Sequence, residues 1–362
     1  MAQIIDQIVK ISIEDAISSV STVDVNAVAL LGASDNGDAV AKEIVSADGA
    51  KNAFGEGSQL HEMAKDFFAQ PTQPSKVVCI PLKKAGANPT AKEIIDAIKG
   101  AGSAGSFYHV CMVGDGIGTV ALATLNEDLE DIKKFLHVQQ ETVTGSAMAD
   151  LKGNKRIAMY KHKEAWGNGK EGDEKVEWKE YLNVAVVAYR CGKDSARGSF
   201  AHKKVDGITP DFYDVEEYNE LISAGVNIYT EVSGEARLFM GTSCDAETFI
   251  DQVVKDDWVR FNVQSAIYRL LGDSNGGYGV NYDDAGIASV AAAVLNVLAV
   301  GEDTDHQYIM AGSSNVQYKS YDYLKKNKME DVKKRNLPLI SGSYARMNTV
   351  NTVVQVSLQV TL

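Results

Sequence analysis

The last thirteen residues alternate between apolar and polar side chains with a period of two. One face is aliphatic apart from a threonine and the other is mostly polar: Val350, Thr352, Val354, Val356, Leu358, Val360 and Leu362 against Asn351, Val353, Gln355, Ser357, Gln359 and Thr361. Alternation in β-branched residues predicts a β-strand. No turn and return strand follow it. Because an isolated strand does not offset the entropy of ordering its backbone, we expect it to pair with a strand from elsewhere.

A similar pattern lies near the other end, where Val9, Ile11 and Ile13 alternate with polar residues. Small residues next to each strand predict flexible joints: Ser18, Ser19 and Ser21 at the front, and Ser341, Gly342 and Ser343 at the back. Two interpretations remain open. The strands complete the chain's own sheet, or they add to the sheet of a neighbouring subunit and link the two by main-chain hydrogen bonds.

Between these two predicted arms, residues 1–22 and 346–362, the first half alternates strands and helices. We predict strands over residues 26–31, 76–82, 107–113, 156–160 and 183–189. We predict helices that begin at Ser58, Thr90 and Asn126, the last of which buries Leu129, Ile132, Phe135 and Leu136. Such alternation is typical of a largely parallel sheet with both faces covered. The predicted fold class is therefore α/β, for a domain over residues 23–197 in which residues 161–179 form an exposed loop.

The second half predicts an α+β domain over residues 198–345. A hairpin is expected over residues 227–241, with its turn at Ser233-Gly234, followed by a long helix capped at Asp245. A second helix, capped at Asp283 or Asp284, carries an apolar stripe. This most apolar helix, residues 287–300, is expected to be too short and too interrupted to span a bilayer.

Composition limits the classes of function. The 362 residues are 45% hydrophobic and 23% charged, as in an ordinary globular protein, and the net charge of −13 argues against binding of nucleic acid or an anionic membrane. The first residues lack the basic start and apolar run of a signal peptide. The four cysteines, Cys79, Cys111, Cys191 and Cys244, form no CxxC pair, and we expect reduced, buried thiols made in a cytoplasm.

The sequence offers little sign of catalysis. The turn from Gly114 to Gly118 follows a predicted strand, as phosphate-binding turns do, but its GxGxG pattern lacks the continuation of GxGxxG. The six histidines have no metal-ligand spacing. Asp256-Asp257 is better explained by helix surface than by a carboxylate pair, because neighbours on a helix point about 100° apart. We predict no catalytic, cofactor-binding or metal-binding residue. A nucleotide-binding enzyme that uses the Gly114–Gly118 turn remains the alternative.

A basic run stands out in this acidic protein: Lys325, Lys326, Lys328, Lys333, Lys334 and Arg335. It is interpreted either as a solvated helix face or as a docking surface for an acidic partner.

Short segments spread over nearly the whole chain resemble phage contractile tail sheath proteins. In order they are Phe54-Gly55, Ala64-Lys65-Asp66-Phe67-Phe68-Ala69-Gln70, Pro74 with the strand after it, Asn227-Ile228-Tyr229, Gly241, Phe249-Ile250-Asp251, Asp257-Trp258, Gln264, Leu270-Leu271, Tyr282-Asp283-Asp284-Ala285-Gly286 and Arg335-Asn336-Leu337-Pro338. Their order and spacing carry the resemblance.

The resemblance implies a structural protein of a virion tail, assembled in the host cytoplasm, and not an enzyme. Such subunits form stacked hexameric rings around a tail tube, between a baseplate and a tail terminator, in a phage or a headless tailocin-like particle. Strands at both ends reach into adjacent subunits, and contraction drives the tube through the host envelope. For this chain it implies that the strands around Val9–Ile13 and Val350–Val360 link subunits, and that the basic run faces the tube or a neighbour. It implies no cofactor, nucleic acid or membrane insertion.

Overall fold

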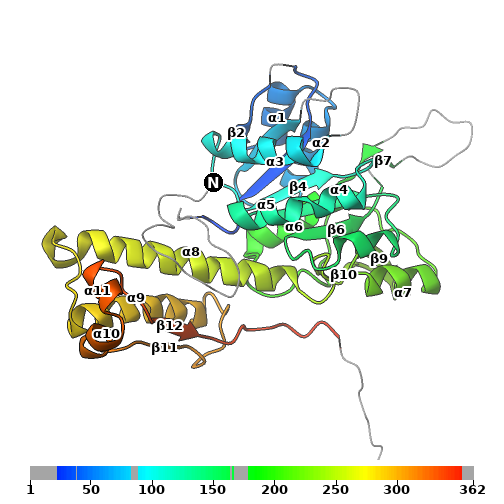
Figure 1. Ribbon diagram of the computed structural model, residues 1–362. Coiled ribbons are helices and arrows are strands. Elements are labelled where there is room, and N and C mark those ends of the chain that lie inside the picture. Colours follow the sequence, from blue (N-terminus) through cyan, green and yellow to red (C-terminus); the bar gives the residue numbers. More distant parts are fainter. Residues whose placement is uncertain (1–22, 38, 83–88, 164, 167–177, 353–362) are drawn as a thin grey trace, which may run out of the picture.

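The computed structural model describes residues 23–37, 39–82, 89–163, 165–166 and 178–352. Figure 1 shows two parts. An α/β body carries a large sheet, and a long helical hairpin projects from it with short elements packed around its second helix.

The body is built on an eight-stranded sheet in the order β10-β9-β6-β5-β4-β1-β3-β2. Its six inner strands are parallel: β1 (Val28–Ala33), β3 (Val77–Leu82), β4 (His109–Val113), β5 (Phe135–Gln140), β6 (Ile157–Lys161) and β9 (Asn227–Val232). Antiparallel strands form both edges: β2 (Lys42–Ile44) and β10 (Glu235–Phe239). The predicted α/β class with a largely parallel sheet is confirmed.

Helices cover both faces of this sheet. Successive strand residues point to opposite sides, so neighbouring residues pack in two different cores. Leu30 packs with one core, together with α1 (Ala47–Phe54), α2 (Gln59–Phe68) and α6 (Leu182–Lys193). Its neighbours Ala29 and Leu31 pack with the other, together with α3 (Ala91–Gly100), α4 (Thr119–Ala123), α5 (Leu125–Ile132) and α7 (Val215–Ser223). Ser58 and Thr90 cap α2 and α3 as predicted, each accepting a backbone N–H of the first turn. All four cysteines are free and buried, also as predicted.

The strand predicted over residues 183–189 is wrong, because this segment belongs to helix α6. Nearly every side chain of α6 is buried, from Leu182 to Cys191. A helix that is covered all round has no amphipathic stripe, and its run of Val and Ala then resembles a buried strand.

The helix predicted from Asn126 to Leu136 is two elements. Helix α5 follows Thr124 and ends at Ile132, where Lys133 adopts a left-handed φ of 50°. Phe135 and Leu136 begin strand β5 and are buried on opposite faces of the sheet. Four apolar residues at helical spacing are therefore divided between two elements: Leu129 and Ile132 belong to α5, and Phe135 and Leu136 belong to β5.

The hairpin expected in the second domain completes the sheet of the first. Strands β9 and β10 turn at Ser233 and Gly234, both with positive φ, as a tight two-residue turn requires. Strand β9 pairs in parallel with β6 through Tyr160 and Asn227, so the sheet extends well past residue 197. Pairing across a sheet joins segments far apart in sequence, which composition does not show.

The projecting hairpin consists of α8 (Ile250–Asp273) and α9 (Asp284–Glu302). The predicted cap at Asp245 is wrong: α8 follows Phe249, and Asp245 accepts from the Thr248 hydroxyl instead. The predicted cap at Asp283 is confirmed. The remaining elements are β7 (Ala165–Trp166), β8 (Trp178–Lys179), β11 (Asn315–Gln317), α10 (Tyr321–Asn327), α11 (Met329–Lys333), β12 (Ser341–Ser343) and 3-10 turns over Ala101–Ser103, Ala147–Leu151 and Ser274–Gly277.

Helix α9 is longer than the sequence suggested. At 19 residues and a mean hydropathy of 1.7 it is, among the described residues, the helix that could span a membrane by length and composition, so the expectation that it is too short is wrong. It lies along α8, and Val294 and Leu298 lie beneath Gly342 of strand β12. Packing between α8 and this small sheet buries part of α9, including Val290 and Leu298, while Leu295 and Val300 remain exposed.

Candidate assembly site

Most of the predicted arm residues lie outside the described part of the chain. These are Val9, Ile11, Ile13, Val354, Val356, Leu358 and Val360, together with the predicted hinges Ser18, Ser19 and Ser21. Val350 is described; its side chain is 77% exposed, and residues 350–352 are in no strand. The predicted C-terminal strand is therefore not formed at these three residues in the isolated chain.

The predicted hinge at Ser341, Gly342 and Ser343 is a paired strand. It forms β12, which runs antiparallel to β11 with Val316 opposite Gly342. Small residues allow a flexible backbone but do not require one. Here the backbone groups of Ser341–Ser343 form hydrogen bonds with β11. In the described part of the chain β11 and β12 pair with each other alone, so the outer edge of each strand is open to another strand.

The basic run lies between β11 and β12 in the chain, on two short helices and the residues next to them. Lys325 and Lys326 occupy the last turn of α10, and Lys333 ends α11. All six basic residues of the run are exposed. Lys333 lies 3.3 Å from Glu330, but both side chains are well solvated and such a pair is weak. All six side chains of the basic run therefore reach solvent, as both interpretations require.

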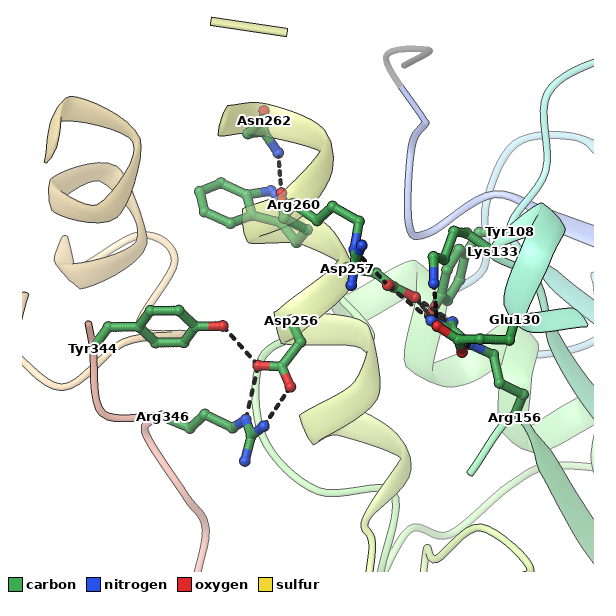
Figure 2. Close-up of polar contacts among 11 residues, drawn as sticks. Tyr108, Glu130, Lys133, Arg156, Asp256, Asp257, Arg260, Asn262, Tyr344 and Arg346 are labelled. Atoms are coloured by element: carbon green, nitrogen blue, oxygen red, sulfur yellow. Dashed lines mark hydrogen bonds and ion pairs between the residues drawn. The ribbon is translucent and has the colours of Figure 1, made fainter. Parts of the chain in front are cut away.

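Asp256 and Asp257 do not lie on a solvated helix face as expected. Figure 2 shows them on one turn of α8, pointing to different partners. Asp257 is 2% exposed, forms a two-pronged ion pair with Arg156 and accepts a 2.6 Å hydrogen bond from the Tyr108 hydroxyl. The ion pair joins the projecting hairpin to the residue immediately before strand β6.

Arg156 also forms an ion pair with a residue of helix α5. Glu130 of α5 accepts from Arg156 and from Lys133, whose side chain is almost fully buried. Burial by itself would raise the pKa of Glu130, but the two cations outweigh it and hold the pKa at about 2. Arg260 Nε lies 3.9 Å from Asp257 Oδ1, so each carboxylate of this cluster is paired with two cations, as buried charges require.

Asp256 points the other way, toward the C-terminal segment. It accepts from the Tyr344 hydroxyl at 2.8 Å and from both nitrogens of the Arg346 fork, with Nε at 2.8 Å. The expected angle of about 100° between neighbours thus separates two sets of partners. The sequence offered the adjacent carboxylates as a signal, but their partners lie about 90 or more residues away.

The Gly114–Gly118 turn lies where strand order reverses between β1 and β4, the usual ligand crevice of such sheets. Here Gln140 closes the turn, because its Nε2 donates to the carbonyl oxygens of Gly114 and Ile117 at 2.6 and 2.9 Å. A Cβ at Gly114 would overlap the side chain of Val138, and Gly116 has a φ of 80°. Close packing and turn geometry thus explain both glycines. In the described residues no group of three or more His, Cys, Asp or Glu side chains is placed to hold a metal ion.

The whole fold is similar to solved structures of contractile sheath proteins. The helical sheath of the anti-feeding prophage, solved in its contracted state, matches with a TM-score of 0.66 at 14% identity, over 96% of this chain and 98% of that one. This chain has a contractile-sheath fold. A chain from the contracted baseplate of the same prophage matches over 98% of both chains with a TM-score of 0.62 at 11% identity.

The sheath fold also relates this chain to a sheath tail protein from Listeria innocua, with a TM-score of 0.55 at 11% identity over 89% of this chain and 95% of that chain. No family model matches the sequence, and no curated protein matches it either. The resemblance to contractile tail sheath proteins is therefore confirmed by the fold.

Proposed function

We propose that this protein is the structural subunit of a contractile tail sheath, polymerising as stacked hexameric rings around a tail tube in a virion tail or a headless tailocin-like particle. The fold match over almost the entire chain supports this proposal most directly. Baseplate and terminator proteins are the further partners it implies. Contraction of the polymer would drive the tube through the host envelope.

Strand exchange is the proposed means of assembly. The alternating segment beyond residue 352 carries backbone donors and acceptors that need partners, and the edges of β11 and β12 offer them. Three-residue strands make a weak sheet by themselves, and an added strand would extend each hydrogen-bonded ladder. The N-terminal segment around Val9–Ile13 is proposed to act in the same way.

Negative-stain microscopy of the purified protein tests the proposal. The intact chain should form rings or tubes, and deletion of residues 353–362 should leave monomers. A sharper pair of variants compares the two faces of the segment: Val356→Ser with Val360→Ser should abolish polymers, and Gln355→Ser with Gln359→Ser should retain them. Monomers from the intact chain under all conditions, or equal effects of the two pairs, would contradict strand exchange.

The enzyme alternative gives a different result. A nucleotide bound at the Gly114–Gly118 turn would raise the melting temperature with ligand concentration. Because Gln140 closes this turn, we expect no shift on addition of ATP with magnesium.

A further inference from the structure

The residues between strand β12 and the end of the described chain follow one defined path. Residues 344–351, which we term the C-terminal strap, continue antiparallel to the segment after α9. The Ala345 carbonyl accepts from Met310 N, and Met347 N donates to the Tyr308 carbonyl, each at 2.8 Å. Ile309 and Arg346 form a bridge between the two segments. The strap is therefore paired along one side.

The other side of the strap lies on the first turns of α8. Gln252, Lys255 and Asp256 fall on one face of the helix, three and four residues apart. Gln252 donates to the Asn348 side chain at 3.3 Å, Lys255 donates to the Met347 carbonyl at 2.7 Å, and Asp256 binds Tyr344 and Arg346. Three helix side chains thus contact four residues of the strap.

The contact of Lys255 is the most telling. Its side chain is fully buried and paired with Asp251 at 2.6 Å, and the Met347 carbonyl supplies a further acceptor. A buried ammonium needs its donors satisfied, so this face of α8 is built to receive a backbone carbonyl. At the far end of the strap, the Asn351 carbonyl accepts from His202 Nε2 at 2.7 Å.

From these contacts we infer that the C-terminal strap is docked on the first turns of α8, on the segment after α9 and on His202 of the body, and that the arm departs after Asn351, not at Ser341–Ser343. The strap is a polar latch. Apart from half-buried Tyr344 and Asn351 its residues are exposed, so its hold depends on hydrogen bonds and on the Asp256–Arg346 pair. Such a latch fixes the direction in which the arm leaves each subunit. That the residues beyond it act as an arm rests on the proposed function, whereas the docking of the strap does not.

Hydrogen–deuterium exchange of the full chain, and of a chain that ends at Thr352, tests the docking. Each is measured in its monomeric fraction, and the shorter chain should be monomeric throughout, so the result is independent of whether the protein forms a sheath. In both chains the amide of Met347 should be protected. Asp256→Asn should accelerate its exchange about fivefold and leave the sheet unchanged, because a half-exposed charge pair contributes modestly.

Asp273→Asn, the same change roughly 25 Å along the same helix, should leave the strap unaffected. Unprotected strap amides in the wild-type monomer would overturn the inference, as would protection that is indifferent to Asp256→Asn. Failure of the intact chain to polymerise would count against the proposed function alone.

Discussion

At the scale of single residues, a second buried cluster of titratable groups lies next to the end of strand β6. His162 is fully buried between two carboxylates, with Nδ1 2.7 Å from Asp211 and Nε2 3.3 Å from Glu180. Burial would lower the pKa of His162, but the two carboxylates outweigh it and the pKa is raised. Next to Glu180, the Tyr181 backbone N–H donates to Asp66, where burial raises the pKa to about 7.

Both shifts make the folded state hold protons more tightly, so stability should fall as pH rises. His162 contributes below its ordinary pKa of about 6.5, and its contribution is lost as pH rises through the raised value. Asp66 keeps a proton that the unfolded chain releases at about pH 4, so its carboxyl is increasingly unfavourable up to about pH 7.

Asp66→Asn removes one of these titrations. Relative to the wild type, its melting temperature should rise by roughly 3–8 °C between about pH 5 and pH 8, since one pKa unit is worth about 1.4 kcal/mol. Differential scanning fluorimetry over this range measures the difference. Parallel curves for the two proteins would show that Asp66 ionises normally.

At the scale of elements, the exposed basic run on and beside α10 and α11 can be tested by charge reversal. None of the α11 side chains is buried, so lysines there contribute little to the fold and are free for a partner. Lys333→Glu with Lys334→Glu should weaken assembly on an acidic tube and leave the melting temperature within about 2 °C of the wild type.

Lys152→Glu with Lys155→Glu provides the matched control, because both side chains are exposed on the α/β body. Co-sedimentation of sheath with tubes at increasing salt compares the two pairs. Equal assembly by the two pairs of variants would mean that the basic run contacts solvent alone.

At the scale of the whole molecule, the Arg156–Asp257 pair is the polar joint between the sheet and the projecting hairpin. Because Asp257→Asn leaves the buried Arg156 with Glu130 as its remaining ion-pair partner and removes the charged acceptor of the Tyr108 hydroxyl, it should lower the free energy of unfolding by about 3–5 kcal/mol. Urea titration measures it, and Asp273→Asn should change it by less than about 0.5 kcal/mol. A cost under about 1 kcal/mol would mean that apolar contacts, such as those of Ile250 and Val254, hold the hairpin without the pair.

The sequence by itself determined whatever depends on local periodicity and local capping. Strands β1, β3, β4 and β6 were predicted from short apolar runs, and helices α2, α3 and α9 from the caps Ser58, Thr90 and Asp283 with one apolar stripe each. The strands are buried on both faces and therefore appear as continuous apolar runs, whereas each helix buries one face and therefore shows a stripe. The order of short family segments also carried the resemblance that the fold comparison confirmed.

Only the tertiary structure decided the features that depend on distant partners. Helix α6 is buried on every side and so shows no stripe, and β9 and β10 join the first sheet through pairing with β6. Asp256 and Asp257 acquire opposite roles from segments some 90 and 100 residues away. Ser341–Ser343 is a strand because β11 lies beside it. Sequence patterns record how a residue relates to its neighbours in the chain, whereas burial, ion pairing and strand pairing are set by what packs against it in space.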